Sequence, residues 1–234
     1  MNKSTTIYSS RMKMADLLAS DMSLLSILQR LDIKLGFGEA TVAEVCREYG
    51  ISTDLFLIIC NIYSFRDYTP QVETLTKDDI KSITTYLRAS HRFYTSISLP
   101  QLHSSIHMLV KELDEVSRKL IDKFYDDYDN EVTGHFRYEE ETVFPYIEQL
   151  TSGELQENSM YNITQFEHNH SNINEKLSDL SNIIIKYLSQ ETTSKLRFEI
   201  LGLIHFISND LQKHSNIEDK LLVPLVSKLE ARHE

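Results

Sequence analysis

Two pairs of side chains along the sequence have the residue types and the spacing of a metal-binding half-site. His135 is followed four residues later by Glu139, and His214 is followed four residues later by Glu218. Residues four apart lie over one another on a helix face, so each pair can direct an imidazole nitrogen and a carboxylate oxygen at one metal ion. A single pair of this kind is more often an ordinary surface contact. Two pairs, each followed by an apolar run and a proline, favour a duplicated half-site.

Two further histidines lie on apolar helix faces. His91 has apolar residues at helical offsets on both sides, and so does His170, whereas the neighbours of His168 at those offsets are polar. An isolated histidine on an apolar face usually bonds to the backbone, but here the two pairs supply partners. The periodicity therefore favours His170 over His168 as the inward residue. The predicted metal ligands are His91, His135, Glu139, His170, His214 and Glu218.

Other polar residues near these positions have more than one interpretation. Glu131 and Asp210 stand four residues before the paired histidines, so they could accept hydrogen bonds from the ligand imidazoles. Solvated charges are the commoner role, and we favour it for both. Glu140 and Glu141 belong to a charge run that we expect to face solvent. No partner is evident for the remaining histidines, which are His103, His107, His205 and His233.

The spacing of the four candidate histidines matches an up-down-up-down four-helix bundle. From residue 78 onward, apolar residues recur with helical periodicity, interrupted near Pro100, at 151–153 and at 191–194. Residues at one level of two antiparallel helices are equally far from the turn that joins them. The midpoint of positions 135 and 170 is about 152, and that of 170 and 214 is 192, so both fall within interruptions. The midpoint of 91 and 135 is Leu113, where no glycine or proline marks a turn.

A separate group of short apolar segments precedes the bundle, between residues 14 and 66. Glycines divide these segments, and a polar stretch over 66–77 that contains Pro70 is the best candidate for a linker. We therefore expect an all-α protein with a small helical N-terminal domain over 1–70 and an up-down-up-down four-helix bundle over 78–234.

The composition excludes several classes of function. The 234 residues carry a net charge of -11 with a pI near 5.3, which argues against a nucleic-acid surface of clustered lysine and arginine. No apolar run approaches the roughly 18–20 residues that span a bilayer, and the N-terminus lacks the apolar stretch of a signal peptide. We therefore expect a cytoplasmic protein without a membrane partner. Cys46 and Cys60 form no CxxC motif and are expected to be buried thiols.

The predicted donor set limits the choice of metal. Four imidazoles and two carboxylates suit iron, manganese or zinc better than calcium or magnesium, which favour oxygen ligands. If two six-coordinate ions share two carboxylates and an oxo or hydroxo bridge, about one position on each remains open to O2, nitric oxide or peroxide. A ferritin-like centre requires two Glu-x-x-His motifs, and only Glu167 with His170 has that spacing. The HExxH, phosphate-loop and GxSxG motifs are absent from the sequence.

The segments HFRYEEETVFP, EHNHSNI and HSNIEDKLLVP, preceded by His91, resemble the hemerythrin-like HHE cation-binding domain. The HFxxEE-like stretch followed by FP is the most specific part. Within that superfamily the sequence is most similar to the iron-sulfur cluster repair di-iron proteins, the RIC family, whose ligands are four histidines and two bridging glutamates. Oxygen-carrying hemerythrins typically have five histidines and a second carboxylate that is usually aspartate, whereas this chain has Glu218 and no evident fifth histidine.

The resemblance extends in part to the N-terminal segment. RIC proteins have a small helical domain there, with a motif close to DFCCGG followed by TLAEAC. This chain has DIKLGFGEATVAEVC, so TVAEVC is similar, but Leu35 to Gly38 replace Cys-Cys-Gly-Gly. The thiol chemistry of that motif therefore does not carry over to this chain.

The resemblance implies a cofactor of two iron ions in an oxo- or hydroxo-bridged centre. It also implies a role in repairing iron-sulfur clusters damaged by nitrosative or oxidative stress, with iron-sulfur proteins as clients, and leaves open whether the protein is an enzyme. A second interpretation is a hemerythrin-like module that binds or senses O2 or nitric oxide and signals through the N-terminal domain. The missing Cys-Cys motif favours this alternative. In a third, the N-terminal domain serves only for docking or for forming a homodimer.

Overall fold

The structure is a computed structural model that describes residues 8–154, 161–169, 173–189 and 193–231. Within these ranges the regular structure is helical, apart from an isolated antiparallel bridge between Lys13 and Thr41. The expected all-α class is thus confirmed. The chain divides into two compact units, one comprising 1–89, 146–164 and 215–234 and the other 90–145 and 165–214. The predicted domains 1–70 and 78–234 stay a prediction.

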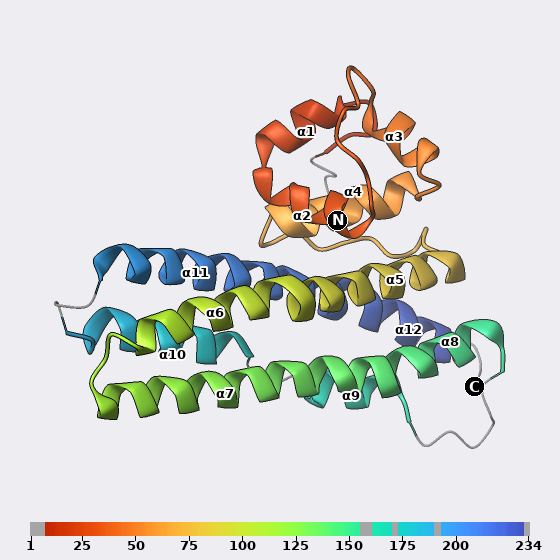
Figure 1. The fold of residues 1–234 in the computed structure, drawn as a ribbon. Coiled ribbons are helices and arrows are strands. Elements are labelled where there is room, and N and C mark those ends of the chain that lie inside the picture. Colours follow the sequence, from red (N-terminus) through yellow and green to blue (C-terminus); the bar gives the residue numbers. More distant parts are fainter. Residues whose placement is uncertain (1–7, 155–160, 170–172, 190–192, 232–234) are drawn as a thin grey trace. The chain divides into compact units, whose positions relative to one another are not determined.

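The first unit contains the N-terminal group of short helices (Figure 1, red to orange). These are α1 (Met14–Ser20), the 3-10 turn η1 (Met22–Leu24), α2 (Leu25–Arg30), α3 (Val42–Glu48) and α4 (Thr53–Ser64). Side chains cap α3 and α4 among them: Thr41 and Glu44 form a reciprocal capping box on α3, and the Ser52 hydroxyl accepts from the amide of Leu55 on α4. Gly50 ends α3 with a φ of 67°, a conformation that favours glycine.

A buried arginine joins these short helices to the first part of α5 (Lys77–Phe93), which belongs to the same unit as far as Ala89. The Arg30 guanidinium donates to the hydroxyl of Tyr63 and, at 3.4 Å, to that of Tyr86, and the two hydroxyls are 2.7 Å apart. Farther along the chain, the ammonium of Lys220 donates to the carbonyl of Arg66 at 2.8 Å. The two hydroxyls thus give the buried Arg30 cation hydrogen-bond acceptors. The Lys220 contact attaches the polar segment after α4 to a helical segment far along the chain.

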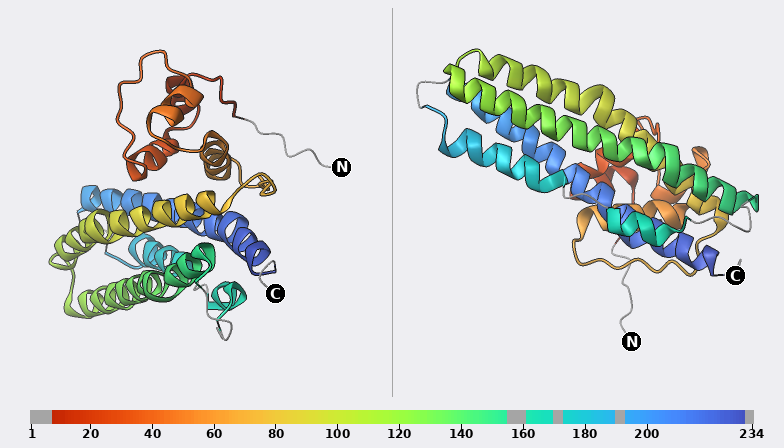
Figure 2. Two further views of the ribbon diagram at one scale, coloured as in Figure 1. Left: turned by 90° about the vertical axis from the view of Figure 1, so that its right-hand side faces the viewer. Right: turned by 90° about the horizontal axis from the view of Figure 1, so that it is seen from below.

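The second unit is a four-helix bundle around one apolar core (Figure 2). Its helices are η2 (Tyr94–Ser98) running into α6 (Leu99–Val110), α7 (Glu115–Tyr138), α10 (Ile173–Lys186) and α11 (Ser194–Ile217), the last of which extends past the unit at its end. Each contributes apolar residues one turn apart, such as Tyr128 and Val132 of α7 and Leu177 and Leu180 of α10. The periodicity from residue 78 onward therefore gives the predicted bundle its core.

The turns at one end of this bundle agree with the predicted spacing. Residues 111–114 join α6 to α7, at the midpoint where no glycine or proline stands. Asp114 marks the start of α7 there, because its carboxylate accepts hydrogen bonds from the amides of Val116 and Ser117 and so caps the helix. Thr193, which immediately precedes α11, donates through its amide to Glu112 at 2.9 Å. The connection between α6 and α7 thus contacts the start of α11.

Each of three prolines follows a five-residue π-helical segment in the described part of the chain. These segments are η2 before Pro100, η3 (Glu139–Val143) before Pro145 and η4 (Glu218–Leu222) before Pro224. Proline has no amide hydrogen, and its ring clashes with the carbonyl four residues earlier, so the helix widens there and then continues. The interruption of periodicity expected near Pro100 is therefore a π segment between α5 and α6, and not a turn. Past the other two prolines run α8 (Phe144–Ser152) and α12 (Val223–Glu230).

The remaining described helix is α9 (Ile163–Asn169). None of the described helices is both long and apolar enough to cross a bilayer.

We predict that the two cysteines of the N-terminal group are unreactive in the folded protein. Both are fully buried, and burial raises the pKa of Cys46 to about 11 and that of Cys60 well above its usual value. Because the thiolate is the nucleophile, iodoacetamide at pH 8 should modify them roughly a hundredfold more slowly than in urea. Mass spectrometry of alkylated protein checks this. Equal rates with and without urea would contradict it.

Candidate metal centre

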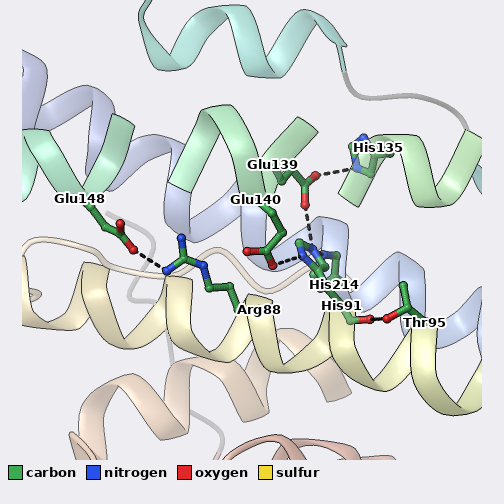
Figure 3. A network of polar contacts seen from close by, with 8 residues as sticks. All are labelled: Arg88, His91, Thr95, His135, Glu139, Glu140, Glu148 and His214. Carbon is green, nitrogen blue, oxygen red and sulfur yellow. Dashed lines mark hydrogen bonds and ion pairs between the residues drawn. The ribbon is translucent and has the colours of Figure 1, made fainter. Parts of the chain in front are cut away.

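His91, on the last turn of α5, is buried with both ring nitrogens in polar contact (Figure 3). Its Nε2 atom lies 2.8 Å from Glu139 Oε2 and 3.2 Å from Nε2 of His214. Its Nδ1 atom lies 2.8 Å from Glu140 Oε1. The imidazole edge that carries Nε2 thus faces a carboxylate and a second imidazole, which is an arrangement of converging metal-ligand atoms.

Glu139 divides its two carboxylate oxygens between histidines of different helices. Oε2 faces His91 of α5, and Oε1 lies 2.7 Å from Nε2 of His135, one turn earlier on α7. The side chain of Glu139 has no exposure to solvent. A carboxylate placed in this way can give one oxygen to each of two cations.

The second predicted pair lies where α11 continues into η4, one turn apart on an unbroken helix. One ligand atom each from His91, Glu139, His214 and Glu218 lies within 4.8 Å of those of the other three, and all four residues are buried. The structure therefore brings four of the six predicted ligands together, and His135 joins them through Glu139.

Aromatic rings surround the imidazoles. His91 stacks on Phe136 at 4.4 Å between ring centroids and on Phe144 at 5.6 Å, with interplanar angles of 24° and 15°. Phe136 also meets His214 edge-on. These rings exclude bulk water from the polar cluster, so the attraction between its carboxylates and a cation is stronger than in solvent.

Tyr94 and Asp210 form a buried pair beside the cluster that sequence reasoning missed. The hydroxyl of Tyr94 donates to Asp210 Oδ2 at 2.7 Å, and the Tyr94 ring stands perpendicular to His214 with centroids 5.7 Å apart. Asp210 is therefore buried, and the solvated role favoured for it is wrong. The sequence around Asp210 gives no indication of this pair, because its partner, Tyr94, comes from another helical segment that only the fold brings close.

Two other acidic residues differ in how well the expectation held. Glu140 was expected to face solvent, but its partly exposed carboxylate accepts from His91, so that expectation is wrong. Glu131 is a partly exposed partner of Lys176, as a solvated charge would be.

The remaining histidines fall outside this cluster or outside the description. His103, His107 and His205 are exposed, the first against Tyr125 and the last beside Asn209. His170 and His233 lie outside the described residues, as does the side chain of His168. The choice between His168 and His170 therefore stays a prediction.

The chemistry of these donors fits a transition metal. Two carboxylates without solvent exposure would repel each other, and buried charges of this kind are paired or coordinate metals. Imidazole with carboxylate suits iron, manganese or zinc, whereas calcium and magnesium favour oxygen shells. The residues thus fit a cation site whose charge offsets both carboxylates.

Comparison with known proteins agrees with this assignment. The model of one protein family, the hemerythrin HHE cation binding domain, matches residues 98–226. The match includes both His-x-x-x-Glu pairs and begins after His91. No curated protein and no solved structure matches the chain.

We predict that Tyr94→Phe destabilises the metal-free protein by roughly 1–3 kcal/mol, because it removes a donor from the buried Asp210 carboxylate. The free energy of unfolding, from urea denaturation followed by circular dichroism, is the measurement. Tyr187→Phe, at a tyrosine 75% exposed, is the control and should change it by less than about 0.5 kcal/mol. Equal effects of the two substitutions would show that the Tyr94–Asp210 bond contributes nothing.

Proposed function

The chain belongs to the hemerythrin HHE cation-binding domain family, and on that premise we propose that its buried histidine and glutamate cluster holds two iron ions. The proposed ligands are His91, His135, Glu139, His170, His214 and Glu218. The observation that carries this proposal is Glu139, whose two oxygens face the imidazoles of two different helices. A mononuclear site would require only one of those oxygens.

The carboxylates, imidazoles and aromatic rings of this cluster have different roles in the proposed centre. Glu139 and Glu218 supply negative charge where no solvent reaches, so they favour cations over water. The histidines supply neutral nitrogen donors that distinguish iron from calcium and magnesium. Phe136 and Phe144 pack against His91 and hold its ring in one plane. When bound, the iron pair supplies open coordination positions for small ligands such as O2 or nitric oxide.

We further propose that the protein repairs iron-sulfur clusters damaged by nitric oxide or oxidants. The ligand pattern of four histidines and two glutamates, like that of the RIC family, supports this role. Buried carboxylates retain iron, whereas their loss would release it.

The runner-up function is reversible binding or sensing of O2 or nitric oxide. The N-terminal helices favour this alternative, because they lack the Cys-Cys motif of the RIC family. Leu35, which is 69% exposed, lies in the segment that replaces the motif. Cys46 and Cys60 are buried with raised pKa values, so neither is a reactive thiol.

We predict that the protein restores an iron-sulfur enzyme inactivated by nitric oxide in a host that lacks its own repair protein, and that Glu139→Leu or Glu218→Leu abolishes the effect. Each substitution removes a ligand proposed to serve both ions, yet leucine is compatible with a buried site, so the helices should persist. Recovery of enzyme activity and circular dichroism are the measurements.

The matched control is Glu141→Leu, which changes an exposed neighbour of Glu139 and should repair like the wild type. Reversible ligand binding by a wild type that never reactivates the enzyme would contradict repair and favour sensing.

We also predict that His170→Ala lowers the iron content of the purified protein while His168→Ala leaves it nearly unchanged. The basis is that the residues at helical offsets from His170 are apolar, whereas those at helical offsets from His168 are polar. Elemental analysis of both variants tests the register. A loss of iron in His168→Ala alone would show that the predicted register is reversed.

A further inference from the structure

We propose that Glu140 is the positioning residue of the metal centre: it holds the proton of His91 on Nδ1 and so presents Nε2 to the metal. This inference rests on the proposed metal centre and adds a residue outside its ligand set. The carboxylate of Glu140 lies 2.8 Å from His91 Nδ1, whereas the other ring nitrogen, Nε2, faces the ligand cluster.

Two consecutive glutamates each contact a different nitrogen of the His91 imidazole. Glu139 Oε2 faces Nε2 and Glu140 Oε1 faces Nδ1, each at 2.8 Å (Figure 3). Consecutive side chains of an α-helix point about 100° apart and seldom share a partner. Here both lie at the start of η3, where the helix widens before Pro145. The π segment thus places a ligand and its neighbour around one imidazole.

The contact determines which nitrogen is free to coordinate. A carboxylate accepts hydrogen bonds, so Nδ1 must carry a proton to donate to Glu140. A nitrogen that coordinates a metal must have lost its proton. With the retained proton on Nδ1, Nε2 becomes the ligand, and Nε2 is the atom that faces Glu139 and His214.

Glu140 also determines which way the ring is flipped. The stacks of His91 on Phe136 and Phe144 fix the plane of the imidazole. A half-turn about the Cβ–Cγ bond would keep that plane, yet it would replace Nδ1 by a carbon and carry Nε2 away from the cluster. Stacking alone does not distinguish the two orientations. The hydrogen bond to Glu140 does, because a carbon in place of Nδ1 would leave it unmade.

The exposure of the two glutamates separates their roles. The side chain of Glu140 is 36% exposed, whereas that of Glu139 has no exposure. Glu140 therefore lies at the edge of the cluster and takes little part in the core. The backbone of His91 is held independently, since the Thr95 hydroxyl donates to its carbonyl at 2.8 Å. Substitution of Glu140 should thus affect metal binding rather than folding.

The test is a competition titration of the full chain with Co²⁺, which reports the affinity of the site without any assay of function. We expect Glu140→Ala to weaken binding by roughly 10–100-fold, the usual effect of removing such a partner. Glu140→Gln, whose amide oxygen still accepts from Nδ1, should recover most of this loss. Glu141→Ala, at the next and exposed position, is the matched control and should bind like the wild type.

A second measurement follows the ring itself. In Zn²⁺-loaded protein, the Nδ1 proton of His91 should exchange slowly with solvent in the wild type and rapidly in Glu140→Ala, as seen by NMR. The melting temperatures of the metal-free variants should agree.

Unchanged affinity and proton exchange in Glu140→Ala, with a wild type that binds metal, would overturn this inference alone. A fall in melting temperature without a fall in affinity would assign Glu140 a structural role and overturn it too. A wild type that binds no Co²⁺ would overturn the metal centre itself and this inference with it.

Discussion

Two fully buried carboxylates impose the constraint on which the rest of the site depends. Glu139 and Glu218 have no exposure to solvent, and their oxygens lie within 4.8 Å of nitrogens of His91 and His214. Burying like charges together costs free energy unless positive charge accompanies them. The donors are imidazoles, which are neutral when they coordinate, so a metal cation is the natural source of that charge. The surrounding aromatic rings then strengthen the attraction by excluding water.

The backbone around the two buried glutamates is shaped by a proline and by the wider helical turn that precedes it. Glu139 and Glu218 are each the first residue of a π segment, and each stands six residues before a proline. Tyr94 holds the same place before Pro100, and its hydroxyl binds Asp210 beside the cluster. A proline that clashes with the preceding turn thus follows each of the π segments that begin with these three residues. Wider turns of this kind are frequent at functional sites, where they change the direction of side chains.

The sequence predicts features that follow α-helical periodicity, but it does not predict side-chain directions where the helix widens or partners that come from another helix. The pair His135 and Glu139 is readable because the four-residue spacing spans ordinary helix, and the core follows from apolar residues one turn apart. A run of charged residues predicts that Glu140 faces solvent, but the wider helical turn directs its side chain to His91. The partner of Asp210 comes from a helix more than a hundred residues away, a relation that no local pattern contains.

The most direct test of the account is the metal content and magnetic state of protein loaded with iron under anaerobic conditions and then oxidised. If Glu139 binds two cations, the protein should hold roughly two irons per chain, coupled antiferromagnetically so that the ferric pair gives no electron paramagnetic resonance signal. One tightly bound ion per chain, or an isolated high-spin ferric signal at full occupancy, would contradict it.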